Sequence, residues 1–319
     1  MGIINFLTAS IRFSTVFLFG STGESLTEKS GNLNLGIPGT MCVGAVFGIL
    51  GESLYLSACA DPTNPNPFLA VFIPLIFSFC GAGLLGLLNS FLTTTLRCNQ
   101  NVTGLTITTF GVGLTNFLGN YIDRTNFNYA SKCFTTVFPF ASDLGWFGQL
   151  FFSYGILVYL AIVIAILVSW FLNKTRAGLH LRAVGENPAT ADAAGLSVTK
   201  YRYLATTIGS GIAGLGGLFY IMDYLTGAWE YSIDAMGWLA VALVIFSVWR
   251  PNVGILGSIL FGALYMAPYF LNVNFAQQEL VKMIPFIVTI VVLIFTSIRN
   301  KKENQPPQAL GVSYFREER

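Results

Sequence analysis

Charged side chains are scarce in this sequence. Only 10% of the residues are Asp, Glu, Lys or Arg, whereas a soluble globular protein carries about 25%. Histidine occurs once, at His180, and the five cysteines are scattered without a CxxC pair. The lack of clustered ligands argues against a metal site or any other cofactor. The formal net charge of +2 argues against nucleic acid as a partner.

Long apolar runs replace the missing charge, and 54% of the residues are hydrophobic. A helix needs about 20 mostly apolar residues to cross the hydrocarbon layer of a bilayer. We therefore predict an all-α, polytopic membrane protein whose residues 1–319 form a single transmembrane domain with about nine transmembrane helices. The predicted spans are 6–23, 37–58, 68–96, 102–119, 147–172, 203–221, 237–249, 253–271 and 281–298.

The basic residues predict the orientation of this path, because Lys and Arg are retained on the cytoplasmic side during insertion. One alternate set of loops holds thirteen of them, and the other set holds Arg124 and Lys132. We therefore expect an external N-terminus, a cytoplasmic C-terminus and a cytoplasmic tail over residues 299–319. The thirteen are Lys29, Arg97, Lys174, Arg176, Arg182, Lys200, Arg202, Arg250, Arg299, Lys301, Lys302, Arg316 and Arg319.

Two further absences narrow the function. No lysine directly follows a glycine, so the phosphate-binding loop GxxxxGK[ST] is missing and any ATP hydrolysis belongs to a partner. We therefore expect no enzymatic activity in this chain. Carboxylates inside the predicted spans are nearly absent apart from Glu52. Ion-driven carriers usually need such groups, so an ion- or proton-coupled secondary transporter or channel is the alternative rather than the first interpretation.

The predicted cytoplasmic loop 173–202 contains a short helix with strong end signals. Asn187 is a suitable N-cap, and Pro188 fits the first helical position because no amide hydrogen is needed there. Alanines fill most of 189–194, and Gly195 is able to end the helix in the left-handed conformation. Such a helix at the membrane face is suited to slot into a groove of a cytoplasmic protein. An ordinary interfacial loop helix explains the same signals equally well.

This loop, GLHLRAVGENPATADAAGLSVTK at 178–200, resembles the coupling signature in permease subunits of ATP-binding-cassette importers of the ribose and nucleoside type. EKSGNLNLGIPG at 28–39, QNVTGLTITTFGVGLTNFLGN at 100–120 and PPQALGVSYFREER at 306–319 are similar to other segments of that family. Pro38 departs from the acidic residue that is common in the nucleoside branch, which leaves the substrate branch open. The resemblance implies that the ATPase is coupled through Arg182, Gly185, Glu186, Asn187, Pro188, Ala191, Ala194 and Gly195.

The same resemblance implies a multi-pass permease of the bacterial cytoplasmic (inner) membrane that imports a small polar solute. A nucleoside is the first expectation, a riboflavin-like compound the second and a sugar such as ribose the third. The implied partners are a cytoplasmic ATP-binding subunit, a second permease subunit, identical or not, and an external substrate-binding lipoprotein.

The fourth predicted span carries a stripe of polar and small residues at helical spacing, which makes it a candidate for the substrate pathway. A helix–helix seam formed by threonine hydroxyls and glycines explains the stripe as well. The glycine-bounded segment GNLNLG could form a constriction, or it could be a simple turn. The pathway candidates are Asn32, Asn34, Asn101, Thr108, Gly111, Thr115 and Asn116.

Overall fold

The computed structural model describes residues 2–230, 233–270, 274, 277, 280–281, 283–299 and 305–316, and within these ranges the regular structure is entirely helical. The longer helices are α1 (Ile3–Glu28), α2 (Ile37–Ala58), α3 (Pro67–Ser90), α4 (Gln100–Gly119), α7 (Ile156–Lys174), α10 (Val198–Phe219), α11 (Ile233–Phe246), α12 (Pro251–Phe270) and α14 (Ile284–Arg299). The shorter ones are α5 (Phe127–Phe134), α6 (Gly145–Phe151), α8 (Arg176–Glu186), α9 (Pro188–Ala193) and the 3-10 turn η2 (Pro139–Ala141). Two π-helical turns, η1 (Phe91–Thr95) and η3 (Tyr220–Tyr224), extend α3 and α10.

Six of the helices in the described part of the chain are long and apolar enough to cross a membrane. They are α1, α2, α3 with η1, α7, α10 with η3, and α12. The α11 helix is apolar but shorter. Each of the nine predicted ranges falls on a helix, while the count of nine crossings remains a prediction.

Asparagine and proline set several helix starts. The side chain of Asn66 accepts a hydrogen bond from the Phe68 amide at the start of α3, and Pro67 occupies the first turn. Asn99 caps α4 in the same way by accepting from the amides of Asn101 and Val102. These local signals explain why the chain turns between apolar runs where it does.

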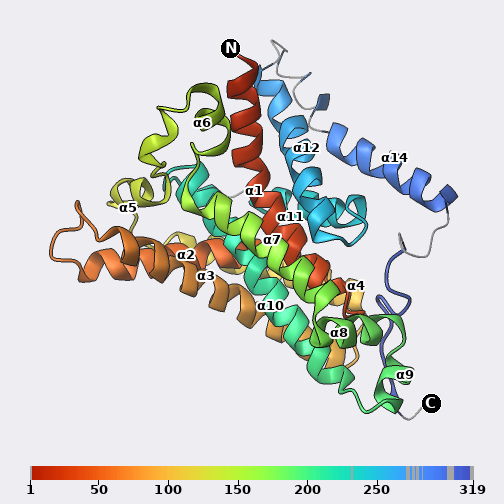
Figure 1. Ribbon diagram of the computed structural model, residues 1–319. Helices are drawn as coiled ribbons and strands as arrows, with labels where there is room; N and C mark the ends of the chain where they lie inside the picture. The colour runs from red at the N-terminus through yellow and green to blue at the C-terminus, as the bar shows by residue number, and fades with distance from the viewer. Residues whose placement is uncertain are drawn as a thin grey trace.

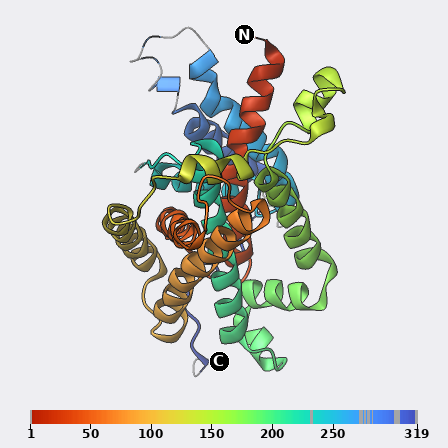
Figure 2. The same cartoon turned by 90° about the vertical axis from the view of Figure 1, so that its left-hand side faces the viewer.

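The two helices α1 and α10 occupy the middle of the bundle. The α1 helix packs against α10, α11 and α12, and α10 also packs against α2 and α3. Figure 1 shows α2 and α3 on one flank and α12 and α14 on the other. In Figures 1 and 2 the start of α1 lies at one end of the molecule, and α9 with the C-terminal segment lies at the opposite end.

Large apolar side chains cover much of the outer surface. Leu84 on α3, Trp170 on α7 and Leu256 on α12 are all more than half exposed. A water-soluble protein rarely exposes so many large apolar side chains, whereas a bilayer stabilises them.

Two predicted span boundaries were wrong. The range 147–172 is divided into α6 and α7, because the chain is extended at Gly155, where an added Cβ would contact the Phe134 carbonyl and the Asp223 carboxylate. The first span continues beyond residue 23 to Glu28. The end of α1 therefore places the carboxylates of Glu24 and Glu28 in the interior.

Candidate functional site

The short helix predicted in the loop is confirmed as α9. The Asn187 side chain accepts a hydrogen bond from the Thr190 amide (3.0 Å), and Pro188 occupies the first turn. The helix ends at Ala193, and Gly195 follows in the left-handed conformation with φ +85°. The Leu196 amide then donates to the Ala191 carbonyl (3.0 Å), which closes the helix end.

The two faces of α9 differ in their surroundings. Ala191 is buried and packs with Val184 and Val198 inside the chain. Thr190 and Ala194 point outward and are exposed. Ala191 therefore lies on the inner face of α9, and Thr190 and Ala194 form its accessible face.

The preceding helix α8 lies against the end of α1. Gly185 is buried, and a Cβ at this position would collide with the Lys29 carbonyl and lie 3.1 Å from the Gly31 amide nitrogen. Only glycine allows this close approach of two backbones. Arg182 is half-buried on the same helix, whereas Glu186 and Asn187 are exposed.

The C-terminal segment 305–316 holds the α8–α9 pair in place. The Ala309 amide donates to the Gly185 carbonyl (3.0 Å), and the Tyr314 hydroxyl donates to Asp192 Oδ2 (2.9 Å) on α9. Arg316 Nε lies 3.3 Å from the same carboxylate. The sequence predicts a cytoplasmic tail here and shows a resemblance to the family, but it does not predict the contact with α9, since no local pattern encodes such a contact.

A buried arginine connects the same segment to the bundle. Arg202 in α10 is 1% exposed, and its Nη1 donates to the Val312 carbonyl (3.2 Å). On the other side of the segment, the Arg97 guanidinium lies over the Phe315 ring at 4.6 Å. The described tail residues thus contact α8, α9, α10 and the turn before α4.

The pathway candidates in the GNLNLG segment are buried between helices. Asn32 Nδ2 donates to Thr206 Oγ1 on α10 (2.9 Å), and the Asn34 amide donates to Glu24 Oε1 on α1 (3.2 Å). Asn34 Oδ1 in turn accepts from the Gly36 amide (3.0 Å). The Asn32 side chain therefore fastens the bridge between α1 and α2 to α10. The Asn34 backbone amide fastens the bridge to α1, and the Asn34 side chain closes a local turn within it.

The stripe on α4 packs against the start of α2. Thr108 Oγ1 donates to the Leu35 carbonyl (2.8 Å), and a Cβ at Gly111 would lie 2.6 Å from the Gly39 carbonyl oxygen. Thr115 is buried on the same face. This geometry is that of a helix–helix seam. Asn101 is exposed and Asn116 is half-buried, so these two residues lie away from its centre.

Buried carboxylates are more frequent than the sequence analysis inferred. Glu24, Glu28, Glu52 and Asp223 are each less than 5% exposed. Trp249 Nε1 donates to Glu28 Oε2, and Arg12 Nε pairs with Asp223 Oδ1 at 3.0 Å. The near absence of such acids was thus a wrong premise in the argument against an ion-coupled carrier. A lone arginine and a lone aspartate in two different apolar segments were the signal for the ion pair.

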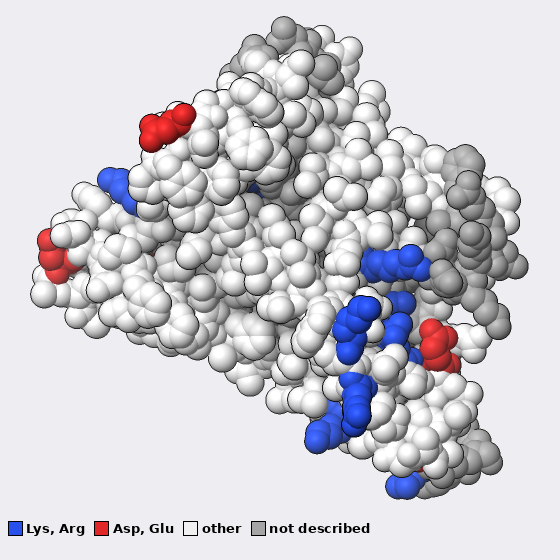
Figure 3. Space-filling model, in the orientation of Figure 1, with Lys and Arg blue, Asp and Glu red and all other residues white. Residues whose placement is uncertain are grey.

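Charge gathers at one end of the molecule. The basic side chains visible in Figure 3 cluster at the end that carries α8 and α9, and isolated charges lie at the other end. Among the residues that the structure describes, no group of three or more His, Cys, Asp or Glu residues is arranged to hold a metal ion. The site therefore consists of a capped helix, a fastening segment and a basic surface.

Within the described residues, several long apolar helices, buried polar bridges and a capped loop helix at one end form the architecture of a multi-pass membrane protein. The sequence model of the branched-chain amino acid transport system permease component matches residues 6–293, and the chain belongs to this family. It is accordingly the permease subunit of an ATP-binding-cassette transporter, a transport component that works with other subunits.

Relatives that are similar over nearly their full length support this assignment. The chain is 31% identical to a putative glucose ABC transporter permease protein, TsgC13, of Haloferax volcanii, over 98% of this chain and 97% of the relative. It is 28% identical to the nucleoside ABC transporter permease protein NupC of Lactococcus lactis, over 99% of both chains. It is also 28% identical to the guanosine ABC transporter permease protein NupQ of Bacillus subtilis, over 98% and 96%. No solved structure is significantly similar to the chain.

Proposed function

We propose that this permease imports a nucleoside. The observation that carries the proposal is the end-to-end similarity to two permeases named for nucleoside and guanosine transport. A neutral polar solute also suits a bundle that buries amide and hydroxyl groups such as those of Asn32 and Thr206. A sugar is the second candidate, because a relative of similar coverage is named for glucose.

Solute uptake tests the substrate. It is compared between a strain that lacks this chain and the same strain complemented with it. Labelled guanosine should enter only the complemented cells, and excess uridine or adenosine should compete. Riboflavin, ribose and glucose serve as competitors of the other classes. Competition by glucose but not by any nucleoside would replace the proposed substrate with a sugar.

We infer the division of labour between subunits from the same family membership. A cytoplasmic ATP-binding subunit and a second permease complete the transporter, and an external lipoprotein delivers the solute. The proposed contact with the ATPase is the outward face of α9 with Asn187, Ala194 and Gly195. Arg182, Gly185, Pro188 and Ala191 support that face from within the permease, and Glu186 lies exposed beside it.

Substitution on this outward face tests the contact without disturbing the interior. Ala194→Arg should abolish co-purification of the ATPase and solute uptake, because a large cation at an exposed fitted contact prevents close approach. Ala189→Ser, a small change at a half-buried position five residues earlier, is the matched control. Normal ATPase association in Ala194→Arg would remove α9 from the interface.

We further propose nine crossings in one membrane domain, with the N-terminus outside and the C-terminus in the cytoplasm. Support comes from Lys29, Arg182 and Arg250, which belong to three different predicted cytoplasmic segments and line one cavity. In a chain whose five native cysteines are replaced, external labelling should reach a cysteine at Asn128 and miss one at Gln308. The reverse labelling pattern would refute this orientation.

The two longer loops on the predicted outer side, 120–146 and 223–236, are the candidate contacts for the lipoprotein. Asp223 belongs to the interior, because it is buried and paired with Arg12. Residues 231–232 lie outside the described part of the chain. We therefore propose 120–146 as the external docking surface.

For the substrate pathway, we propose that two α4 residues, Asn101 and Asn116, contact the solute. The other candidates hold the adjoining bridge in shape; they are Asn32, Asn34, Thr108, Gly111 and Thr115.

A further inference from the structure

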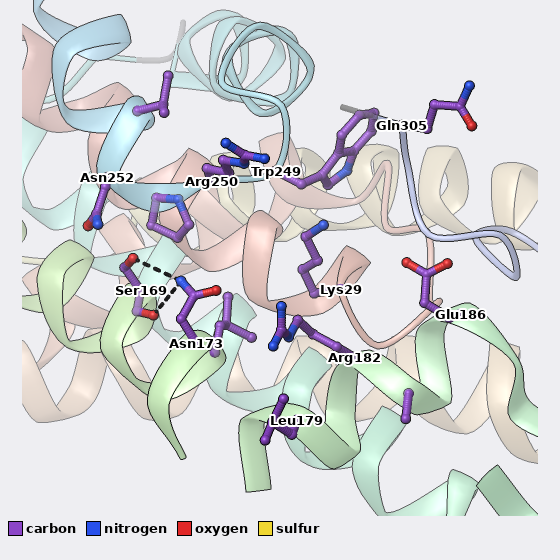
Figure 4. Close-up of a pocket in the computed structure, with 14 residues that line it drawn as sticks. Lys29, Ser169, Asn173, Leu179, Arg182, Glu186, Trp249, Arg250, Asn252 and Gln305 are labelled. Carbon is purple, nitrogen blue, oxygen red and sulfur yellow. Dashed lines mark hydrogen bonds between the residues drawn. The ribbon is translucent and has the colours of Figure 1, made fainter. Parts of the chain in front are cut away.

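A cavity of about 810 Å³ opens at the same end of the molecule as α8 and α9. Its walls come from the end of α1, the end of α7, α8, and the turn between α11 and α12. Figure 4 shows the side chains of Lys29, Arg182 and Arg250 directed into this space from three of these elements. Ser169 and Asn173 line the opposite wall, where Asn173 Nδ2 donates to the Ser169 carbonyl (2.9 Å).

Positive charge predominates in the cavity. Glu186 is the one carboxylate among the described residues that line it, against three cations. Burial lowers the pKa of the Lys29 amine; the charge of Glu186 opposes this effect, the charges of Arg182 and Arg250 add to it, and Glu28 opposes it more weakly. Arg182 Nε is buried without a hydrogen-bond partner in the described structure. An anion in the cavity would relieve this repulsion and satisfy the unpaired donor.

An apolar stripe leaves the cavity along α12. Val253 lines the cavity, and Leu256 and Leu260 follow it at helical spacing on the same face. All three side chains are at least 40% exposed. A ligand that extends from the cavity along this stripe would thus have an anionic head and an apolar tail.

We propose that the cavity binds the phosphate group of an acidic phospholipid, with Lys29, Arg182 and Arg250 around the phosphate and an acyl chain along Val253, Leu256 and Leu260. Basic pockets between membrane helices commonly hold anionic headgroups. The volume is large enough for a phosphate with its glycerol backbone, and larger than inorganic phosphate alone needs. A bound lipid joins the end of α1 to α8 and to the start of α12.

Lipid binding to the purified full-length permease tests the proposal. Delipidated protein in mild detergent is titrated with phosphatidylglycerol or phosphatidylcholine, and bound lipid is counted by native mass spectrometry. The wild type should prefer phosphatidylglycerol. The triple variant K29Q/R182Q/R250Q should bind it about a hundredfold more weakly, the product of about fivefold for each basic side chain.

The matched control neutralises three exposed basic residues outside the cavity. K174Q/R176Q/K200Q has the same net charge change and should keep the preference for phosphatidylglycerol. Equal losses in both triple variants would mean non-specific attraction to anionic lipid and would overturn the site. Should the first triple variant misfold, R182Q and R250Q are measured singly, and each should weaken binding about fivefold.

A further arm distinguishes a lipid from a soluble phosphate. Inorganic phosphate and ATP are titrated into the delipidated protein by calorimetry and are then used as competitors against bound phosphatidylglycerol. Failure of both to displace the lipid at millimolar concentration supports a headgroup site. Tight binding of either one, together with no preference between the two phospholipids, would overturn the lipid assignment.

Discussion

The α1–α10 seam and the contact between α9 and the C-terminal segment hold the same chain together by different means. In the α1–α10 seam, Gly23 and Gly209 bring two backbones so close that an added Cβ on either one would collide with the other helix. In the α9 contact, Asp192 accepts a hydrogen bond from Tyr314 and pairs with Arg316, whose side chain is 75% exposed.

The difference lies in what each contact tolerates. A close-packed seam in lipid gains its energy from many short-range contacts, so that an added atom disrupts it. A partly exposed polar contact is weak and exchanges with water. The seam therefore suits a fixed frame, and the α9 contact suits a part that moves with a partner.

The largest effect should follow from breaking the ion pair beside the α1–α10 seam. Asp223→Asn removes the charge that pairs with Arg12 and leaves the hydrogen bond from Arg12 Nη2 to the carbonyl of residue 223, and removing one member of such a part-buried pair costs about 3 kcal/mol. Thermal unfolding in detergent should show a clear loss of stability. The double variant Arg12→Gln with Asp223→Asn should recover most of it, and an equally unstable double variant would contradict the pairing argument.

A single added methyl group should break the seam itself. Gly23→Ala places a Cβ against the Gly209 carbonyl and 2.9 Å from the Ala213 amide nitrogen. We expect a loss of about 1–3 kcal/mol from overpacking, measured by thermal unfolding. Gly113→Ala is the matched control, because nothing lies within 4 Å of its added Cβ. If both variants unfold alike, close backbone packing is not what stabilises the seam.

At the end of α9, the backbone conformation of Gly195 allows a narrower test. Gly195→Val should cost about 1–2 kcal/mol, because a β-branched residue is poorly tolerated at φ +85°. Nothing lies within 4 Å of the added Cβ, so a steric clash is not the cause. Solute uptake and ATPase co-purification should fall while the permease stays in the membrane. Gly195→Asn should retain more activity, since asparagine tolerates this conformation better.

The smallest effect should come from the polar contact of α9. Tyr314→Phe removes one hydrogen bond to Asp192 and should cost about 1 kcal/mol. Hydrogen exchange should become faster in α9 and remain unchanged in α1. Tyr121→Phe, which changes an exposed ring at a distance from α9, is the control. Unaltered exchange in Tyr314→Phe would mean that the C-terminal segment does not restrain α9.

Local signals in the sequence predicted much of this structure. Apolar runs located helices in all nine ranges, and the Asn187 cap, Pro188 and Gly195 gave α9 to within one residue. These features depend on neighbours in sequence, which is why a pattern reveals them.

Tertiary contacts explain what the sequence did not reveal. The burial of Ala191 depends on Val184 and Val198 packing against it, and alanine alone does not indicate which face of a helix is inside. The last turn of α1 carries Glu24 and Glu28 into the interior, where Asn34 and Trp249 donate to them. From the sequence alone, a carboxylate next to a loop is expected to be solvent-exposed, because the hydrogen-bond donors that bury it come from distant parts of the chain.

The contact between Gly185 and Ala309 joins two segments that are synthesised at different times. The ribosome makes residues 305–316 after all of the helices described above, so α8 and α9 emerge long before the segment that fastens them. A nascent chain that stalls near its end would already hold its apolar helices in the bilayer with α9 still unfastened. The hydrogen bonds of Ala309 to Gly185 and of Tyr314 to Asp192 therefore form only after residues 305–316 have been made.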